Sequence, residues 1–242
     1  MLKNLILRRI RLSHYFWIFF SVYLVASVSL PDYKFDSSAL TLFSVNSFLY
    51  GFYIAPILGA QKARIEELHR IVRAEANALF GLMLSFKKLP TDLRTKLQVH
   101  VCNYVDVKLK AKTSVGGEEE YEKLIGFCLA YKGTHQDQID KSLQQVIANQ
   151  QNRTNFAMQF VNRVYANEWH IMAILFSITL GFILLIEIKD TIILHIVRAL
   201  LCTGLSMLIL ILMKLSTLTH KKANQMWDPL IKLRDTRFYR ID

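Results

Sequence analysis

The chain has 242 residues, of which 52% are hydrophobic and 20% are charged, and its formal net charge is +11. Its mean hydropathy is +0.25 despite these charges, so the apolar residues must be gathered into blocks, as in membrane proteins and unlike disordered chains. The low content of 9 Gly and 4 Pro excludes collagen-like and linker-like chains. The 3 Cys are too few for a disulfide framework, and their lack of CxxC spacing argues against a metal site.

Four blocks are long enough to cross a bilayer, which takes about 20 apolar residues. They are residues 15–30, 39–60, 169–186 and 191–213. None contains Asp or Glu, and Arg198 is their only basic residue apart from histidine. The first block follows a basic stretch, as a signal peptide would, but it is rich in aromatic residues and no Ala-x-Ala site follows it. We therefore expect it to be retained as a span.

Charge predicts the orientation of the spans. The segment before the first span carries +4, each of the two short loops carries −1, and residues 61–168 and the basic tail 214–242 each carry +4. By the positive-inside rule, both termini and residues 61–168 are expected in the cytoplasm. The predicted domains are therefore an N-terminal hairpin (1–60), a cytoplasmic domain (61–168), a C-terminal hairpin (169–213) and the tail.

The cytoplasmic segment shows helical periodicity throughout, so we predict an all-α fold. The first helix should continue from the second span to Leu89-Pro90, and the last should enter the third span without interruption, because neither junction contains Pro or Gly. Apolar stripes predict the core, and those of the later helices include Leu129 and Ile147. In the first helix the stripe comprises Ile65, Leu68, Ile71, Val72, Ala76, Leu79, Leu82 and Met83.

No motif for catalysis is present, so we expect no enzyme activity and no cofactor or metal. Scattered basic residues without a known module argue against nucleic-acid binding. Three cytoplasmic carboxylates have arginines at helical spacing and are expected to form solvated pairs. They are Glu66, Glu67 and Glu75.

Polar residues inside spans are functional candidates. One face of the second span combines aromatic rings with an amide group; it comprises Phe43, Asn46, Tyr50, Tyr53 and Ile57. This face could line a narrow water-filled path, or it could be an ordinary helix-packing surface. In the fourth span, Arg198 and His195 could attract an anion at an outer vestibule. Alternatively, Arg198 could extend outward to Glu187 or Asp190.

The stretch 73–110 resembles the bestrophin-like domain family of bacterial and plant membrane proteins. The residues that carry the resemblance are Glu75 to Leu79, Leu89-Pro90, and Tyr104-Val105. The family has the same order of two spans, a helical cytoplasmic insertion and two more spans. Its name implies kinship with bestrophins, which are pentameric anion channels whose pore is lined mainly by the second span.

Two functions are compatible with these features. The first is a homo-oligomeric, preferably pentameric, channel for inorganic anions such as chloride, in which the second span lines the pore. The alternative is a non-conducting membrane scaffold whose cytoplasmic helices bind a protein partner. Since there is no organelle-targeting segment, we expect either protein in the lipid bilayer of a bacterial inner membrane.

Overall fold

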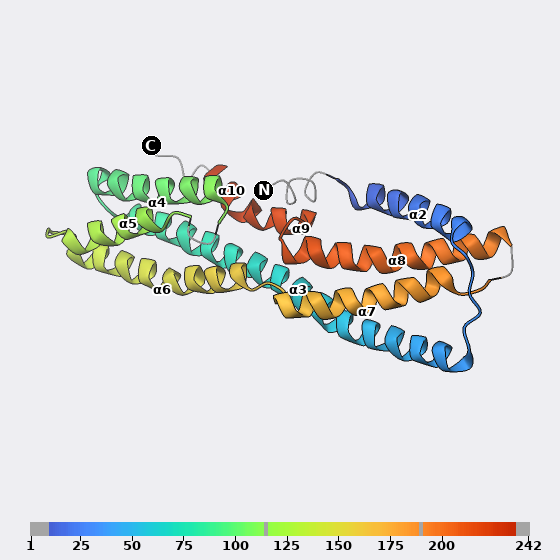
Figure 1. Cartoon of the computed structure of the whole chain (residues 1–242). Helices are drawn as coiled ribbons and strands as arrows, with labels where there is room; N and C mark the ends of the chain where they lie inside the picture. The colour runs from blue at the N-terminus through green and yellow to red at the C-terminus, as the bar shows by residue number, and fades with distance from the viewer. Residues whose placement is uncertain (1–9, 114–115, 189–190, 236–242) are drawn as a thin grey trace. The chain divides into compact units, whose positions relative to one another are not determined.

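The computed structural model describes residues 10–113, 116–188 and 191–235, and these parts of the chain are helical apart from their connections (Figure 1). The chain divides into two compact units. We call residues 1–63 and 163–220 the apolar unit, and residues 64–162 and 221–242 the polar-helix unit. Among the described residues, four helical stretches are long and apolar enough to cross a membrane, as predicted.

The apolar unit contains α2 (Leu12–Ser29), the first part of α3 (Ser37–Phe86), α7 (Ala166–Leu185) and α8 (Ile192–Ser216). Figure 1 shows α2 lying beside α8 and α7 beside α8. Both α2 and α7 are apolar on all sides, which is typical of helices surrounded by lipid. The small core of this unit joins α3, α7 and α8 through Tyr50, Ile54, Met172 and Leu212.

The polar-helix unit places α4 (Thr91–Ala111), α5 (Glu118–Ala130) and α6 (Gln136–Val161) around the second part of α3. All eight residues of the stripe predicted for α3 are buried, which confirms that prediction. Two positions of the later stripes, Leu129 and Ile147, are exposed, so the prediction that they lie in the core is wrong. Acidic residues occupy the first turn of α5, where they interact favourably with the helix dipole.

The C-terminal segment folds onto the polar-helix unit as α9 (Lys221–Asn224), a 3₁₀ turn (Gln225–Trp227) and α10 (Asp228–Asp235). Trp227 is buried, and its ring lies 5.5 Å from that of Phe156, centroid to centroid. The His69 ring nitrogen Nε2 lies 2.7 Å from the backbone oxygen of Lys222. This part of the predicted tail is therefore packed structure.

Continuity between the membrane and the polar helices holds for the second span only. Helix α3 is unbroken from Ser37 to Phe86, with Pro56 inside it, as predicted. The prediction that the last polar helix enters the third span without interruption is wrong, because α6 ends at Val161 and α7 begins at Ala166.

Side chains explain this interruption, which no Pro or Gly marks in the sequence. Arg64 donates hydrogen bonds of 2.7 Å to the backbone oxygens of both Gln159 and Phe160, which satisfies carbonyl groups at the end of α6. At the start of α7, the Glu168 carboxylate accepts a 2.9 Å hydrogen bond from the Tyr165 backbone N–H. The end of α6 is thus capped by Arg64, which only the folded chain brings into position, whereas the start of α7 is capped locally by Glu168.

Candidate functional site

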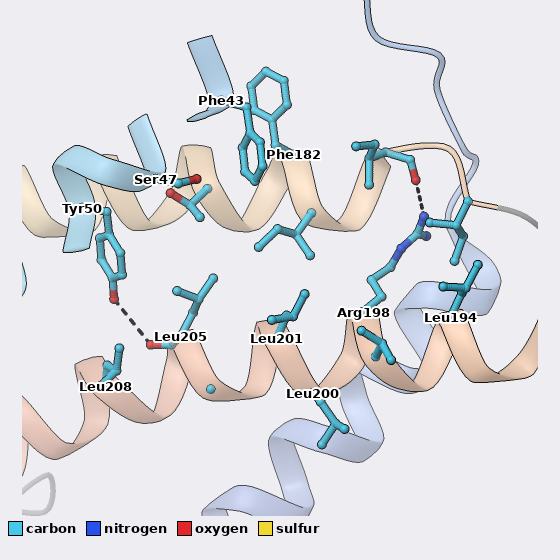
Figure 2. A pocket seen from close by; sticks show the side chains of 16 residues that line it. Phe43, Ser47, Tyr50, Phe182, Leu194, Arg198, Leu200, Leu201, Leu205 and Leu208 are labelled. Atoms are coloured by element: carbon cyan, nitrogen blue, oxygen red, sulfur yellow. Dashed lines mark hydrogen bonds between the residues drawn. The ribbon is translucent and has the colours of Figure 1, made fainter. Parts of the chain in front are cut away.

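The predicted pore face of α3 packs against other helices of the same chain. Asn46 donates hydrogen bonds to the Leu175 backbone oxygen at 3.1 Å and to Thr179 Oγ1 at 2.8 Å, both in α7. Tyr50 is buried, and its hydroxyl donates a long 3.5 Å bond to the Leu205 oxygen of α8 (Figure 2). These contacts satisfy the polar groups within one chain, as helix packing requires.

The other three residues of that face are also occupied in packing. The Phe43 ring stacks on Phe182 of α7 at 5.3 Å between centroids. Tyr53 and Ile57 pack against the core cluster of α3, α7 and α8. The lining of a pore by these five residues stays a prediction, and no contact within the chain favours it over packing.

The described parts of the chain leave the opposite face of α3 exposed. Its exposed residues recur at steps of three and four: Ser44, Phe48, Phe52, Ala55 and Gly59. Phe48 and Phe52 are each 69% exposed, and their rings stack at 6.0 Å between centroids. Large apolar groups left uncovered by their own chain indicate contact with lipid, with another subunit or with a conduction path.

Arg198 is a buried residue of the apolar unit with polar partners in the connections around it. Its side chain is 2% exposed and forms a 3.0 Å ion pair with Asp32, in the loop between α2 and α3. It also donates hydrogen bonds to the backbone oxygens of Leu184 and Ile186 at the end of α7. We call these four residues the Arg198 clasp.

The clasp provides Arg198, the charged residue within the fourth span, with its partners. The partner carboxylate is Asp32 rather than Glu187, which pairs with Lys34 instead, and Asp190 lies outside the described residues. A guanidinium at the C-terminal end of α7 satisfies free carbonyl groups and the helix dipole at once. Backbone hydrogen bonds also join the loop after α2 to the end of α7 and the loop that follows it. The Tyr33 N–H donates to the Leu185 oxygen, and the Glu187 N–H donates to the Tyr33 oxygen.

Electrostatics within the clasp favour the ionised carboxylate. Burial acts to raise the pKa of Asp32, but the hydrogen bond and charge of Arg198, with the backbone N–H of Ile188, bring that pKa below its ordinary value. His195 lies near enough to add to this effect, and its Nδ1 is 2.9 Å from Ser27 Oγ of α2. Arg198 is therefore already neutralised by a carboxylate, so an anion attracted to it would compete with Asp32.

A buried cluster, the Glu75 network, joins the helices of the polar-helix unit. Glu75 of α3 is fully buried, and both of its carboxylate oxygens lie 2.6 Å from the Lys108 ammonium of α4. The Tyr104 hydroxyl donates a short hydrogen bond to the same carboxylate. The prediction that Glu75 forms a solvated pair with a neighbouring arginine is wrong, whereas Glu67 does form one with Arg70.

Arg153 of α6 extends the Glu75 network to α5. Its guanidinium lies over the Tyr121 ring at 3.9 Å from the centroid, and it pairs with Glu118 at 3.3 Å. Burial raises the pKa of Tyr104 well above its ordinary value, and the Glu75 charge adds to this effect. Burial lowers the pKa of Lys108, which the Glu75 carboxylate opposes. Tyr104 therefore stays protonated and remains a donor to Glu75.

The sequence contained an indication of the Glu75 network, but the arginines at helical spacing from Glu75 favoured a different pairing. Glu75 lies four residues after Ile71 and four before Leu79, so it falls within the apolar stripe. Lys108 follows Tyr104 by one helical turn on the buried side of α4. An acidic and a basic residue that each lie within a buried apolar stripe are expected to form an ion pair, because burying an unpaired charge costs free energy. Among the described residues, no His, Cys, Asp or Glu group could hold a metal ion.

Gly117 shapes the wall of the Glu75 network. Its φ is +85°, and a Cβ placed there would lie 2.8 Å and 2.9 Å from atoms of the Tyr104 ring. We expect Gly117→Ala to lower the free energy of unfolding by about 2 kcal/mol, from left-handed strain and the clash. Gly126→Ala is the control, since space is open around that helical glycine and a small stabilisation is expected. Thermal unfolding of both variants measures the difference, and equal shifts would contradict this role for Gly117.

These features define an integral membrane protein of the all-helical class, with four helices suited to crossing a bilayer. The family model of the bestrophin-like domain matches residues 16–220. The chain therefore belongs to the bestrophin-like domain family, which confirms the resemblance, and it is related to bestrophin channels. No curated protein and no solved structure matches it. Glu75 and Tyr104, two residues that carried the resemblance, are hydrogen-bonded to each other in the Glu75 network.

Proposed function

We propose that the chain is one subunit of a ring-shaped, preferably pentameric, anion channel in which α3 lines the pore. The observation that supports it best is the exposed face of α3, where no helix among the described residues covers Phe48 and Phe52. From Ser37 to Gln61 this helix has no charged residue. Such a face suits a hydrophobic constriction, which gates conduction by excluding water.

The proposed ion preference rests on charge and on ring electrostatics. The uncovered face carries no carboxylate that would attract cations. Aromatic edges carry partial positive charge, so rings turned edgewise to a pore tolerate anions better than cations. The basic surplus of the chain would further raise the local anion concentration at the pore entrance. We also propose that both termini and the polar-helix unit are cytoplasmic, in a bacterial inner membrane, as the charge distribution predicts.

Chloride flux tests the proposal. The full chain, reconstituted into liposomes, is expected to release chloride, and Phe52→Ala is expected to raise the flux several-fold by widening the constriction. Trp17→Ala, which removes an exposed aromatic ring from α2, is the matched control and should leave the flux unchanged. Absence of flux from a correctly folded protein, or equal effects of the two variants, would overturn the proposal. A monomer or dimer in detergent would also overturn it.

The second candidate is the non-conducting scaffold. The observation that favours it is the exposure of large apolar residues on the polar-helix unit, including Leu129 of α5 and Ile147 and Met158 of α6. Exposed apolar groups are common at protein interfaces. A protein that co-purifies at fixed stoichiometry, and that Ile147→Asp releases without unfolding the chain, would favour the scaffold. Retention of such a partner by that variant would count against it.

A further inference from the structure

We infer that the apolar unit has a binding site for one acyl chain of a lipid, with the carbonyl oxygen of its head group at Arg198. A pocket of about 790 Å³ lies between α3, α7 and α8, entirely within the apolar unit (Figure 2). Its volume falls within the roughly 300–1,000 Å³ typical of ligand pockets. The site is independent of whether the protein conducts ions.

The walls of the pocket are suited to a hydrocarbon. Phenylalanine rings from α3 and α7 face leucine side chains of α8, and the labelled residues of Figure 2 show both sides. Water is not expected to fill such a space, because water needs two to four polar partners. The pocket belongs to helices suited to a bilayer, so acyl chains are the most abundant apolar molecules beside it.

Two polar atoms at the pocket have no hydrogen-bond partner. Among the described residues, five buried side-chain polar atoms are unpartnered, and two of them, Arg198 Nε and Ser47 Oγ, belong to residues that line this pocket. The other polar side chains of the lining are satisfied: Thr179 bonds Asn46 and Leu175, and Tyr50 bonds Leu205. A buried donor without an acceptor is energetically costly, so we expect an oxygen acceptor beside Arg198 Nε.

The charge of the clasp selects the kind of acceptor. Asp32 already neutralises Arg198, so the site does not require an anion. A carbonyl oxygen of an acyl ester, or of a fatty acid in its protonated form, provides the acceptor without adding charge. From Arg198 to Leu208 the pocket follows ten residues of α8, which is about 15 Å and leaves room for an extended apolar tail beyond the head group.

Photolabelling tests the site. The full-length protein in detergent micelles is treated with palmitic acid that carries a mid-chain diazirine, and the adducts are mapped by mass spectrometry. Adducts are expected on the pocket residues Leu201 and Leu205. Gly204→Phe should reduce them at least tenfold, because Gly204 lines the pocket and open space surrounds its Cβ position. Gly181→Phe is the control, since that glycine of α7 has similar space but does not line the pocket.

Competitors test the head group and its source. Unlabelled palmitic acid should displace the probe at least tenfold better than hexadecane, which lacks an oxygen, and equal displacement would overturn the role of Arg198 Nε. Displacement by a palmitoyl phospholipid would identify an ester-linked chain as the source, and displacement by palmitic acid alone would identify the free acid. Labelling that is uniform over the exposed helices, or unchanged by Gly204→Phe, would overturn the site.

A second measurement keeps the test valid if Gly204→Phe fails to fold. Native mass spectrometry of the wild-type protein should show one bound acyl species per chain that is released on denaturation. A wild-type protein free of acyl species would overturn the proposal. Cross-links at Leu201 between two copies, without bound lipid, would also overturn it, because a second subunit would then occupy the pocket.

Discussion

Replacing Glu75 with Gln is expected to lower the free energy of unfolding of the polar-helix unit by about 3–5 kcal/mol. The change leaves the Lys108 ammonium, which is only 3% exposed, without the carboxylate that both of its short contacts require. The loss should be visible as a shift of denaturant-induced unfolding followed by circular dichroism. Hydrogen exchange in α4 should rise as well, because α4 supplies both Tyr104 and Lys108.

Replacing the whole Glu75 network with apolar residues tests whether the loss of stability comes from the unpaired charge or from a change of side-chain shape. The triple variant Glu75→Leu, Lys108→Met, Tyr104→Phe should recover most of the loss, because apolar groups of similar volume replace a buried ion pair at little cost. Glu67→Gln is the control, since it breaks an exposed pair with Arg70 that contributes about 0–1 kcal/mol. Equal losses for Glu75→Gln and Glu67→Gln would show that the buried pair does not hold these helices together.

Replacing Asp32 with Asn is expected to destabilise the apolar unit by about 2 kcal/mol, below the range for fully buried pairs because the Asp32 side chain is 30% exposed. The Arg198 charge would then face only neutral acceptors, the amide oxygen of the new Asn and the carbonyl oxygens of Leu184 and Ile186. Unfolding by dodecyl sulfate in mixed micelles, followed by circular dichroism, measures the change. Glu187→Gln breaks the exposed contact with Lys34 and should have an effect below about 1 kcal/mol.

The clasp also predicts a dependence on acid. The folded-state pKa of Asp32 lies below its unfolded value of 3.8, so its contribution to stability is complete above that value and is lost as the pH falls through the lowered pKa. Asp32→Asn should remove this part of the acid dependence, while Glu187→Gln should keep it. An unchanged acid profile in Asp32→Asn would show that the ion pair with Arg198 contributes nothing to folding.

Much of the fold could be predicted from hydrophobic blocks and periodicity. The four blocks correspond to α2, the first part of α3, α7 and α8, because about 20 apolar residues have no stable alternative to a helix in lipid. The break at Leu89-Pro90 and the acidic start of α5 also follow from local chemistry. The gap between α6 and α7 could not be predicted this way, since Arg64 reaches it from a distant position in the chain.

The sequence by itself determined the class of protein, the spans, the family and the buried stripe of α3. These properties depend on composition and on contacts close along the chain, which periodicity records directly. Only the tertiary structure decided the partners of the charged groups. It paired Glu75 with Lys108, 33 residues away, and Arg198 with Asp32, 166 residues away. It also placed Asn46 and Tyr50 on the packed face of α3 and left Phe48 and Phe52 uncovered, because a helix shows which residues share a face but not which face meets a neighbour.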